Sequence, residues 1–171
     1  MPDPRIRPVR EADVDEVVRL VHDLARYERE PDACTLRAED LRAALFGPRP
    51  ALFGHVAEHG GGVVGVALWF LNFSTWRGSH GIYLEDLYVD PTCRGLGLGR
   101  ALLTALAEEC HARGYARLEW AVLDWNAPSI AFYRALGAEP MDDWTVFRLT
   151  DEPLRTLGSG TRPAMSADAA P

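Results

Sequence analysis

Three glycines that alternate with other residues form the part of this sequence best suited to bind a ligand. They are Gly95, Gly97 and Gly99, and they lie between Arg94 and Arg100. A glycine has no Cβ, so the backbone can approach a ligand closely there. Leucines and alanines follow at helical spacing, and the free N–H groups and dipole of a helix start bind anions such as phosphate. The loop and its two arginines therefore predict a phosphate-binding site.

Two familiar phosphate-binding motifs do not fit this loop. A P-loop has a lysine followed by serine or threonine after its last glycine, whereas Arg100-Ala101 follows Gly99 here. The dinucleotide fingerprint G-x-G-x-x-G would need a third glycine where Arg100 stands. On this local pattern alone, a glycine-rich turn without a ligand stays an alternative.

The segment Arg94-Gly95-Leu96-Gly97-Leu98-Gly99 resembles the R/Q-x-x-G-x-G/A signature with which GNAT N-acetyltransferases bind acyl-coenzyme A. Other segments resemble one branch of that superfamily, the diamine acetyltransferases that act on spermidine, spermine and thialysine. The similarity runs from about Ile6 to Leu149. The segments that carry it are Ile6-Arg7-Pro8, Leu24-Ala25-Arg26-Tyr27-Glu28, Tyr83-Leu84-Glu85-Asp86 and Trp125-Asn126-Ala127-Pro128-Ser129-Ile130-Ala131-Phe132-Tyr133.

The pattern of apolar residues predicts an α/β (α+β) fold with a mixed sheet and helices on both faces. A first helix should begin at Asp13, where Glu16 completes a capping-box pattern, and carry an apolar stripe to Ala25. Gly114 is expected to end the helix that follows the glycine loop. Two more helices are expected at 36–46 and 126–136, and strands at 5–9, 51–58, 62–73, 81–89, 116–123 and 145–149.

A chain of 171 residues with 47% hydrophobic content predicts one compact domain, here over residues 1–157. Residues 158–171 are mostly glycine, serine, threonine, proline and alanine, which predicts a disordered tail. The resemblance implies a GNAT fold, with a mostly antiparallel sheet that splays at the strand ending near Val89. Acetyl-CoA would lie in that opening, and a bulge would interrupt the strand.

The resemblance also implies which residues contact the coenzyme. Main-chain groups near Val89 would hold the pantetheine arm and the thioester carbonyl, and the glycine loop would hold the pyrophosphate. Asn126 could cap the following helix as well. The full set is Leu87, Tyr88, Val89, Arg94, Gly95, Leu96, Gly97, Leu98, Gly99, Arg100, Asn126 and Ser129.

Acetyl transfer to an amine needs a base and an acid. An alkyl amine has a pKa of ~10, so it must lose a proton before it can attack a thioester. Glu85 is the candidate base because the family's amine-binding carboxylate falls there, within an otherwise apolar strand. Asp86 and Asp90 are its rivals, and strand alternation would put Glu85 and Asp86 on opposite faces. The alternative is a solvated or ion-paired glutamate.

Tyr133 is the candidate acid that protonates the departing thiolate. A phenol pKa of ~10 is not far above the thiol's ~8.5, so this transfer is feasible. In the family, the tyrosine at this position of the N-x-P-S-x-x-F-Y segment has that role. Composition alone would favour a packing role beside Phe132.

Several residues are expected to bind the amine. The resemblance assigns Tyr27 and Glu28 at the end of the first helix, and carboxylates and aromatic faces both suit an ammonium chain. Trp76 and Asp143, with Asp142 and Trp144, could line the same pocket. The resemblance implies an acidic residue where Ser74 stands here, which weakens the case for long polyamines such as spermine. A shorter diamine, a thialysine-like amine or a lysine-like amine fits as well.

Composition and residue spacing argue against several classes of binding partner and cofactor. A net charge of −7 argues against nucleic acid, and no apolar run is long enough to span a membrane. Three cysteines and five scattered histidines show no disulfide or metal-ligand spacing, so we expect no metal and a reducing, cytoplasmic location. The resemblance implies a homodimer that acetylates a small-molecule amine. A protein-lysine or N-terminal acetyltransferase and a non-catalytic acyl-CoA sensor are the alternatives.

Overall fold

The computed structural model describes residues 2–160 of the 171-residue chain. The chain forms two compact units, which divide between Asn126 and Ala127. The expectation of a single domain over residues 1–157 stays a prediction. No helix in the described part of the chain is long and apolar enough to cross a membrane.

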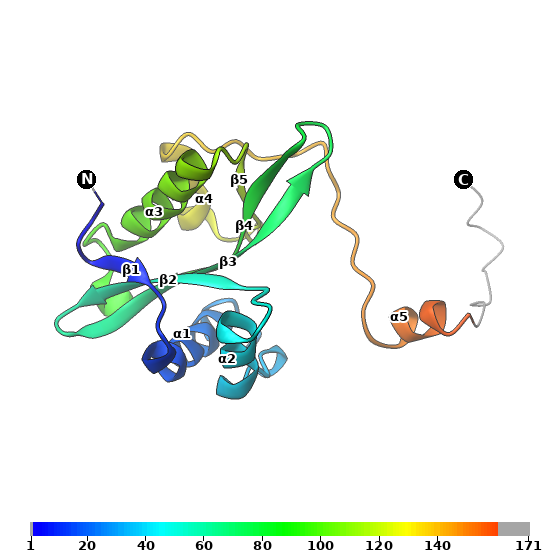
Figure 1. The fold of residues 1–171 in the computed structure, drawn as a ribbon, viewed down its shortest axis with the longest axis horizontal. Coiled ribbons are helices and arrows are strands. Elements are labelled where there is room, and N and C mark those ends of the chain that lie inside the picture. The colour runs from blue at the N-terminus through cyan, green and yellow to red at the C-terminus, as the bar shows by residue number, and fades with distance from the viewer. Residues whose placement is uncertain (1, 161–171) are drawn as a thin grey trace. The chain divides into compact units, whose positions relative to one another are not determined.

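The first unit is built on a five-stranded sheet whose strands lie in sequence order (Figure 1). The first four strands pair antiparallel, and the fifth pairs parallel with the fourth. This is the mixed, mostly antiparallel sheet that the sequence predicts. The strands are β1 (Ile6–Pro8), β2 (Phe53–His59), β3 (Gly62–Ser74), β4 (Ser79–Val89) and β5 (Leu118–Trp120).

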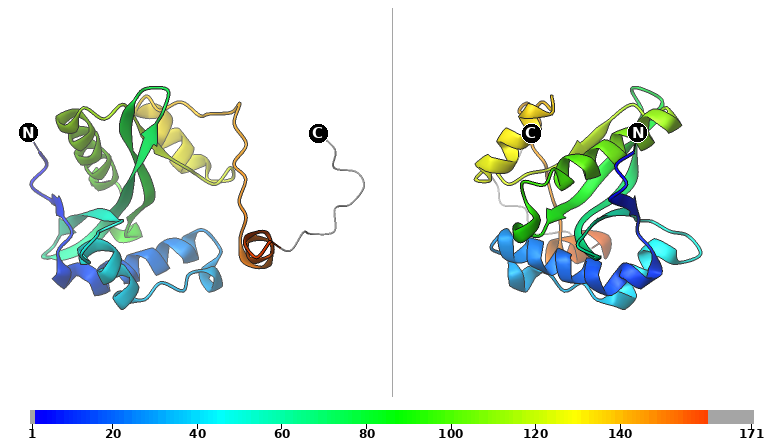
Figure 2. Two further views of the ribbon diagram at one scale, coloured as in Figure 1. Left: turned by 45° about the vertical axis from the view of Figure 1, so that its right-hand side comes forward. Right: turned by 90° about the vertical axis from the view of Figure 1, so that its left-hand side faces the viewer.

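Helices cover both faces of this sheet, as predicted (Figures 1 and 2). One face is covered by α1 (Val14–Tyr27) and α2 (Ala38–Phe46), and the other by α3 (Leu98–Arg113). Gly114 ends α3 with a φ of 66°, as predicted. Three 3-10 turns lie between these elements, at Glu11–Asp13, Pro31–Ala33 and Pro91–Cys93.

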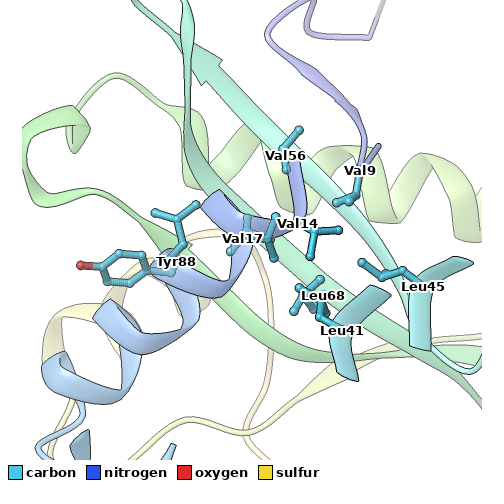
Figure 3. Packing of buried hydrophobic residues seen from close by; sticks show 10 residues of the cluster. Val9, Val14, Val17, Leu41, Leu45, Val56, Leu68 and Tyr88 are labelled. Carbon is cyan, nitrogen blue, oxygen red and sulfur yellow. The ribbon is translucent and has the colours of Figure 1, made fainter. Parts of the chain in front are cut away.

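The core between α1, α2 and the sheet is an apolar cluster (Figure 3). The helical spacing of α1 turns Val14, Val17 and Leu20 toward the strands, and each is fully buried. Burial of one such side chain contributes roughly 1.5–3 kcal/mol. Other members of the cluster are Leu41 and Leu45 of α2 and Val56, Val66, Leu68 and Tyr88 of the sheet.

The start of α1 differs from the capping box expected of Asp13 and Glu16. The Asp13 carboxylate makes no capping bond to α1. It accepts two hydrogen bonds from the Arg7 guanidinium, at 2.6 and 2.9 Å, and one from the Arg10 amide at 2.7 Å. The Arg7 bonds lower the pKa of Asp13. Asp13 is buried, so the charged partner on β1 is favoured over the exposed helix start.

A β-bulge interrupts β4 at Glu85. Leu68 pairs with Asp86 and Trp69 pairs with Leu84, so Glu85 has no partner on β3. The extra residue changes which face the later residues occupy, because side chains alternate along a strand. Asp86 therefore lies on the α1 face with Leu68, although Leu84, two residues earlier, pairs with Trp69 outside that cluster.

The sheet opens after this bulge. β5 pairs with β4 only over Ile82–Leu84, so it is shorter than the strand predicted at 116–123. Beyond the bulge, residues 85–89 pair with no β5 residue in the described chain. The sheet thus splays near Val89, where β4 pairs with β3 but no longer with β5.

The second unit contains α4 (Ala127–Ala135) and α5 (Asp151–Gly158). The strand predicted at 145–149 does not form, since these residues pair with no strand in the described chain and Val146 and Phe147 are exposed. Alternating apolar residues give strand propensity, but a strand needs a partner for its main-chain groups. The sequence analysis missed α5. The predicted tail begins where α5 ends, and residues 161–171 lie outside the described part.

Candidate active site

The glycine loop leaves open space at the start of α3. Gly95 and Gly97 have φ values of 79° and 76°, and a Cβ added at either would meet nothing within 4 Å. The first helical bond runs from the Ala101 amide to the Gly97 carbonyl at 3.0 Å. The preceding amides of the first turn have no partner within the helix. Open space beside these amides, with Arg94 and Arg100 exposed, fits the phosphates of a coenzyme.

The other predicted coenzyme residues differ in whether their side chains or only their main-chain groups could contact a coenzyme. Leu98 and Tyr88 have buried side chains, so only their main-chain groups could reach a coenzyme. Leu87 and Val89 belong to the part of β4 that β5 leaves open. The Val89 carbonyl accepts a hydrogen bond from Arg94 Nε at 3.2 Å, which joins the strand end to the glycine loop.

Tyr27 connects the glycine loop with the segment before α4. The Arg94 guanidinium lies 4.9 Å from the centroid of the Tyr27 ring. The Tyr27 hydroxyl donates to Oδ1 of Asn126 at 3.1 Å, and its ring lies 6.2 Å from that of Trp125. The Arg29 guanidinium also lies over the Trp125 ring, 4.4 Å from its centroid. Tyr27 thus contacts both Arg94 and Asn126, and the binding roles of these three residues stay predictions.

Three carboxylates gather where α1 ends beside the bulge. Burial, together with the charges of Glu85 and Glu28, raises the pKa of Asp86 to about 6. Burial also raises the pKa of Glu28. Glu85 is exposed, as expected of a bulged residue. Two of the predicted carboxylates, Glu28 and Glu85, are therefore brought to one place, together with the rival Asp86.

Two other candidates lie elsewhere. Asp90 caps the turn that follows β4, since its carboxylate accepts bonds from the amide and hydroxyl of Thr92 at 2.9 and 2.7 Å. These bonds lower the pKa of Asp90. Trp76 lies in the β3–β4 turn and is 90% exposed. The seven residue steps from Ser79 to Asp86 span about 23 Å at strand rise, so this chain does not bring Trp76 to the carboxylates.

The remaining candidates belong to the second unit. Ser129 and Tyr133 are four residues apart on α4, which puts them on one face of that helix. The Tyr133 ring lies 5.3 Å from that of Phe132. Asp143 lies in a turn closed by a bond from the Trp144 amide to the Met141 carbonyl. Their catalytic and binding roles stay predictions.

The sequence analysis gave no role to Arg29 and Trp125. Arg29 has a φ of 68°, a left-handed conformation that side chains other than glycine rarely adopt. No sequence signal reveals this, because the residue that usually ends a helix this way is glycine. Trp125 stood inside a matching segment, but an exposed tryptophan has no partner that can be read from sequence. Within the described residues, no group of three or more potential ligands could hold a metal ion.

Known proteins resemble this chain closely. Residues 17–138 match the model of the acetyltransferase (GNAT) family. The chain is 39% identical to the thialysine N-epsilon-acetyltransferase of Bos taurus over 163 residues, 89% of this chain and 95% of that protein. It is 37% identical to the L-ornithine N5-acetyltransferase of Arabidopsis thaliana over 95 residues, 56% of this chain and 42% of that one.

A solved structure gives the same fold. An integron cassette protein from V. cholerae superposes with a TM-score of 0.75 at 24% identity, over 90% of this chain and 96% of that one. The family match covers most of the first unit and α4, including the glycine loop. The chain belongs to the acetyltransferase (GNAT) family and is an acetyl-CoA-dependent N-acetyltransferase.

Proposed function

We propose that this enzyme transfers the acetyl group of acetyl-CoA to a primary amine of a small cationic substrate. The substrate class is a diamine, a polyamine or a thialysine-like amine, and the amine attacks the thioester directly. The names of the thialysine and ornithine relatives support a small substrate that carries a terminal amine.

The observation that carries this proposal is the carboxylate cluster of Glu28, Glu85 and Asp86. Acidic side chains attract an ammonium group and can accept its proton. Tyr27 precedes Glu28 and lies under Arg94 of the glycine loop, which links the cluster to the coenzyme site. An amine held by the carboxylates would therefore be near the acyl end of a coenzyme in the β4 opening.

In the proposed reaction, a carboxylate takes one proton from the ammonium group. The amine nitrogen then forms a bond to the thioester carbonyl carbon, and the bond from that carbon to sulfur breaks. The thiolate leaves and takes a proton from Tyr133. The nitrogen then loses its second proton, which passes through solvent to the tyrosinate, so that the products are a neutral amide, a thiol and one proton on the carboxylate. Glu85 is the proposed base, acting directly or through water, and its exposure at the bulge gives a substrate ready access.

Asp86 is a second candidate for the base, because its environment differs from that of Glu85. Burial and two neighbouring carboxylates raise its pKa to about 6, and a general base works best when its pKa is near the working pH. The two assignments predict different pH profiles after substitution.

The test is a thiol-release assay with acetyl-CoA and a panel of amines, with product masses to confirm acetylation. We expect turnover on thialysine, ornithine, putrescine and spermidine that exceeds turnover on lysine-containing peptides. Turnover only on peptides would instead identify a protein-lysine or N-terminal acetyltransferase. Coenzyme binding without turnover on any amine would identify an acyl-CoA sensor.

We further propose a homodimer in the cytoplasm. Met141, Trp144, Val146 and Phe147 are each at least 65% exposed, and a second copy of the chain would cover them. Sedimentation equilibrium tests this, and a monomer at micromolar concentration would contradict it. The three cysteines are free thiols, which fits a reducing compartment.

A further inference from the structure

The end of α1 presents two opposite charges side by side. Glu28 is half-buried at the helix end and Arg29 is exposed immediately after it. In the part of the chain that the structure describes, neither side chain forms an ion pair or a hydrogen bond. Burial raises the pKa of Glu28, and no charge among the described residues lowers it, so the Arg29 guanidinium does not lie against this carboxylate.

Arg29, which follows the end of α1, has an uncommon backbone conformation. Its φ of 68° is costly for a residue with a Cβ, and such strain in a native structure points to a use for the side chain. Its guanidinium stacks 4.4 Å from the centroid of Trp125. A stacked guanidinium keeps its N–H groups in the ring-parallel plane and available to an anion.

The surrounding contacts place this pair on the amine side of the site. Trp125 lies beside Tyr27, and the Tyr27 ring also contacts Arg94 of the coenzyme loop. Glu28 lies near enough to Asp86 to raise its pKa. This series of contacts has Arg94 of the coenzyme loop at one end and Arg29 at the other, and Arg29 has no carboxylate partner in the described part of the chain.

A pure diamine has no group that would use a cation there. An α-amino acid with a terminal amine does, because its head carries a carboxylate beside an ammonium group. Arg29 suits the carboxylate and Glu28 suits the α-ammonium, while the terminal amine would reach the carboxylates at the bulge.

We infer that Arg29 is a specificity-determining residue that binds the α-carboxylate of a diamino acid substrate. This inference rests on the proposed function, since it assumes acetylation of a terminal amine. It goes further in choosing diamino acids over diamines as the substrate class and in naming the residue that distinguishes them.

The experiment compares substrates that differ only by the carboxylate. One pair is thialysine and bis(2-aminoethyl) sulfide, and the other is ornithine and putrescine. Steady-state kinetics at saturating acetyl-CoA are measured for the wild type, Arg29→Gln, Arg29→Lys and Arg26→Gln. Arg26 is the matched control, because it is an exposed arginine in the last turn of α1 whose guanidinium pairs with Asp23.

We expect Arg29→Gln to lower kcat/KM for both diamino acids by roughly 10- to 100-fold, mainly through KM, since a charge-assisted hydrogen bond is lost. Activity on the two diamines should change by less than about threefold or rise, because they lose only a repulsive charge. Arg29→Lys should restore much of the diamino acid activity. Arg26→Gln should leave all four substrates unaffected.

The contrary outcomes are distinct. Equal losses on diamines and diamino acids would mean that Arg29 only supports Trp125, and no loss on either would mean that it contacts no substrate; both overturn the inference. A wild-type enzyme active on diamines alone also overturns it while the proposed function stands. Inactivity on all four amines overturns the proposed function and the inference together.

Discussion

The hydroxyl of Tyr27 donates a hydrogen bond of 3.1 Å to Oδ1 of Asn126. This bond joins the end of α1 to the segment before α4, across 99 residues of sequence. Asn126 is only 5% exposed, so water cannot readily replace the hydroxyl.

Tyr27→Phe should therefore lower the free energy of unfolding by about 1 kcal/mol, the usual net contribution of one hydrogen bond. The ring contact with Arg94 does not need the hydroxyl, so coenzyme affinity should change by less than threefold. Urea unfolding and calorimetric titration with acetyl-CoA measure the two effects. A large loss of coenzyme affinity with unchanged stability would place the hydroxyl against the coenzyme instead.

Gly97→Asp should abolish acetyl-CoA binding, because it adds a side chain and a negative charge where phosphate is expected to lie. Gly97→Asn is the matched control: it has the same shape and the same strain at a φ of 76°, without the charge. Calorimetry should show weaker binding for asparagine and none for aspartate. A folded Gly97→Asp variant with normal affinity would remove the glycine loop from the coenzyme site.

Glu85→Gln should keep coenzyme affinity, lose most turnover on amines and shift the pH profile of kcat/KM upward. The reason is that only deprotonation of the amine is impaired, and raising the pH supplies free amine without a base. Asp86→Asn is measured beside it. If Glu85→Gln leaves the profile unmoved while Asp86→Asn removes a limb near pH 6, the base is Asp86.

Asp86 also predicts how stability depends on pH. Its pKa is about 6 in the folded protein and 3.8 ordinarily, so the folded state holds this proton more tightly. At pH 4 and below, the effect on stability is small; as the pH rises through 6, ionisation of the buried carboxyl destabilises the fold. A shift of this size corresponds to roughly 3 kcal/mol at most.

Asp86→Asn should therefore raise the free energy of unfolding at pH 8 and change it little at pH 4. Urea unfolding at several pH values measures the difference, with the exposed Glu108→Gln as the control. Curves for the wild type and Asp86→Asn that run parallel from pH 4 to 8 would contradict the raised pKa.

Tyr133→Phe should lower kcat by roughly 10²–10⁴, the usual contribution of a positioned proton donor. Coenzyme affinity should fall by little, and melting should barely move because phenylalanine keeps the ring beside Phe132. Steady-state kinetics and thermal melting separate this from a packing role. A near-normal kcat would assign the proton to water or to another residue.

The apolar periodicity of the sequence predicted most elements of the first unit. Gly114 was predicted to end the helix after the glycine loop, and the structure has a φ of 66° there, in the left-handed region where glycine commonly ends a helix. The strand predicted at 62–73 agrees closely with β3, which runs from Gly62 to Ser74. Local patterns were sufficient in these cases because a turn or a face of one element decides them.

Predictions that depend on a distant partner were weaker. The segment at 145–149 has strand composition but finds no strand to pair with in the described chain. Asp13 has capping composition, but Arg7 on β1 binds its carboxylate. Strict alternation separated Glu85 from Asp86, and a bulge cannot be seen in alternation alone. The stacking of Arg29 on Trp125 joins residues 96 positions apart in number, and no pattern in the sequence announces it.

Because of the bulge at Glu85, the number of residues in β4 decides which face of the sheet its later side chains occupy, whereas most single side chains affect only their own contacts. Deleting one residue between Ile82 and Asp86 would restore alternation, and Asp86 and Tyr88 would then turn toward α3. Substitutions in this stretch change one contact each, whereas an odd insertion or deletion exchanges the two faces of everything up to the glycine loop. Among related enzymes, the number of residues between the β3–β4 turn and the glycine loop should therefore vary less than their identities.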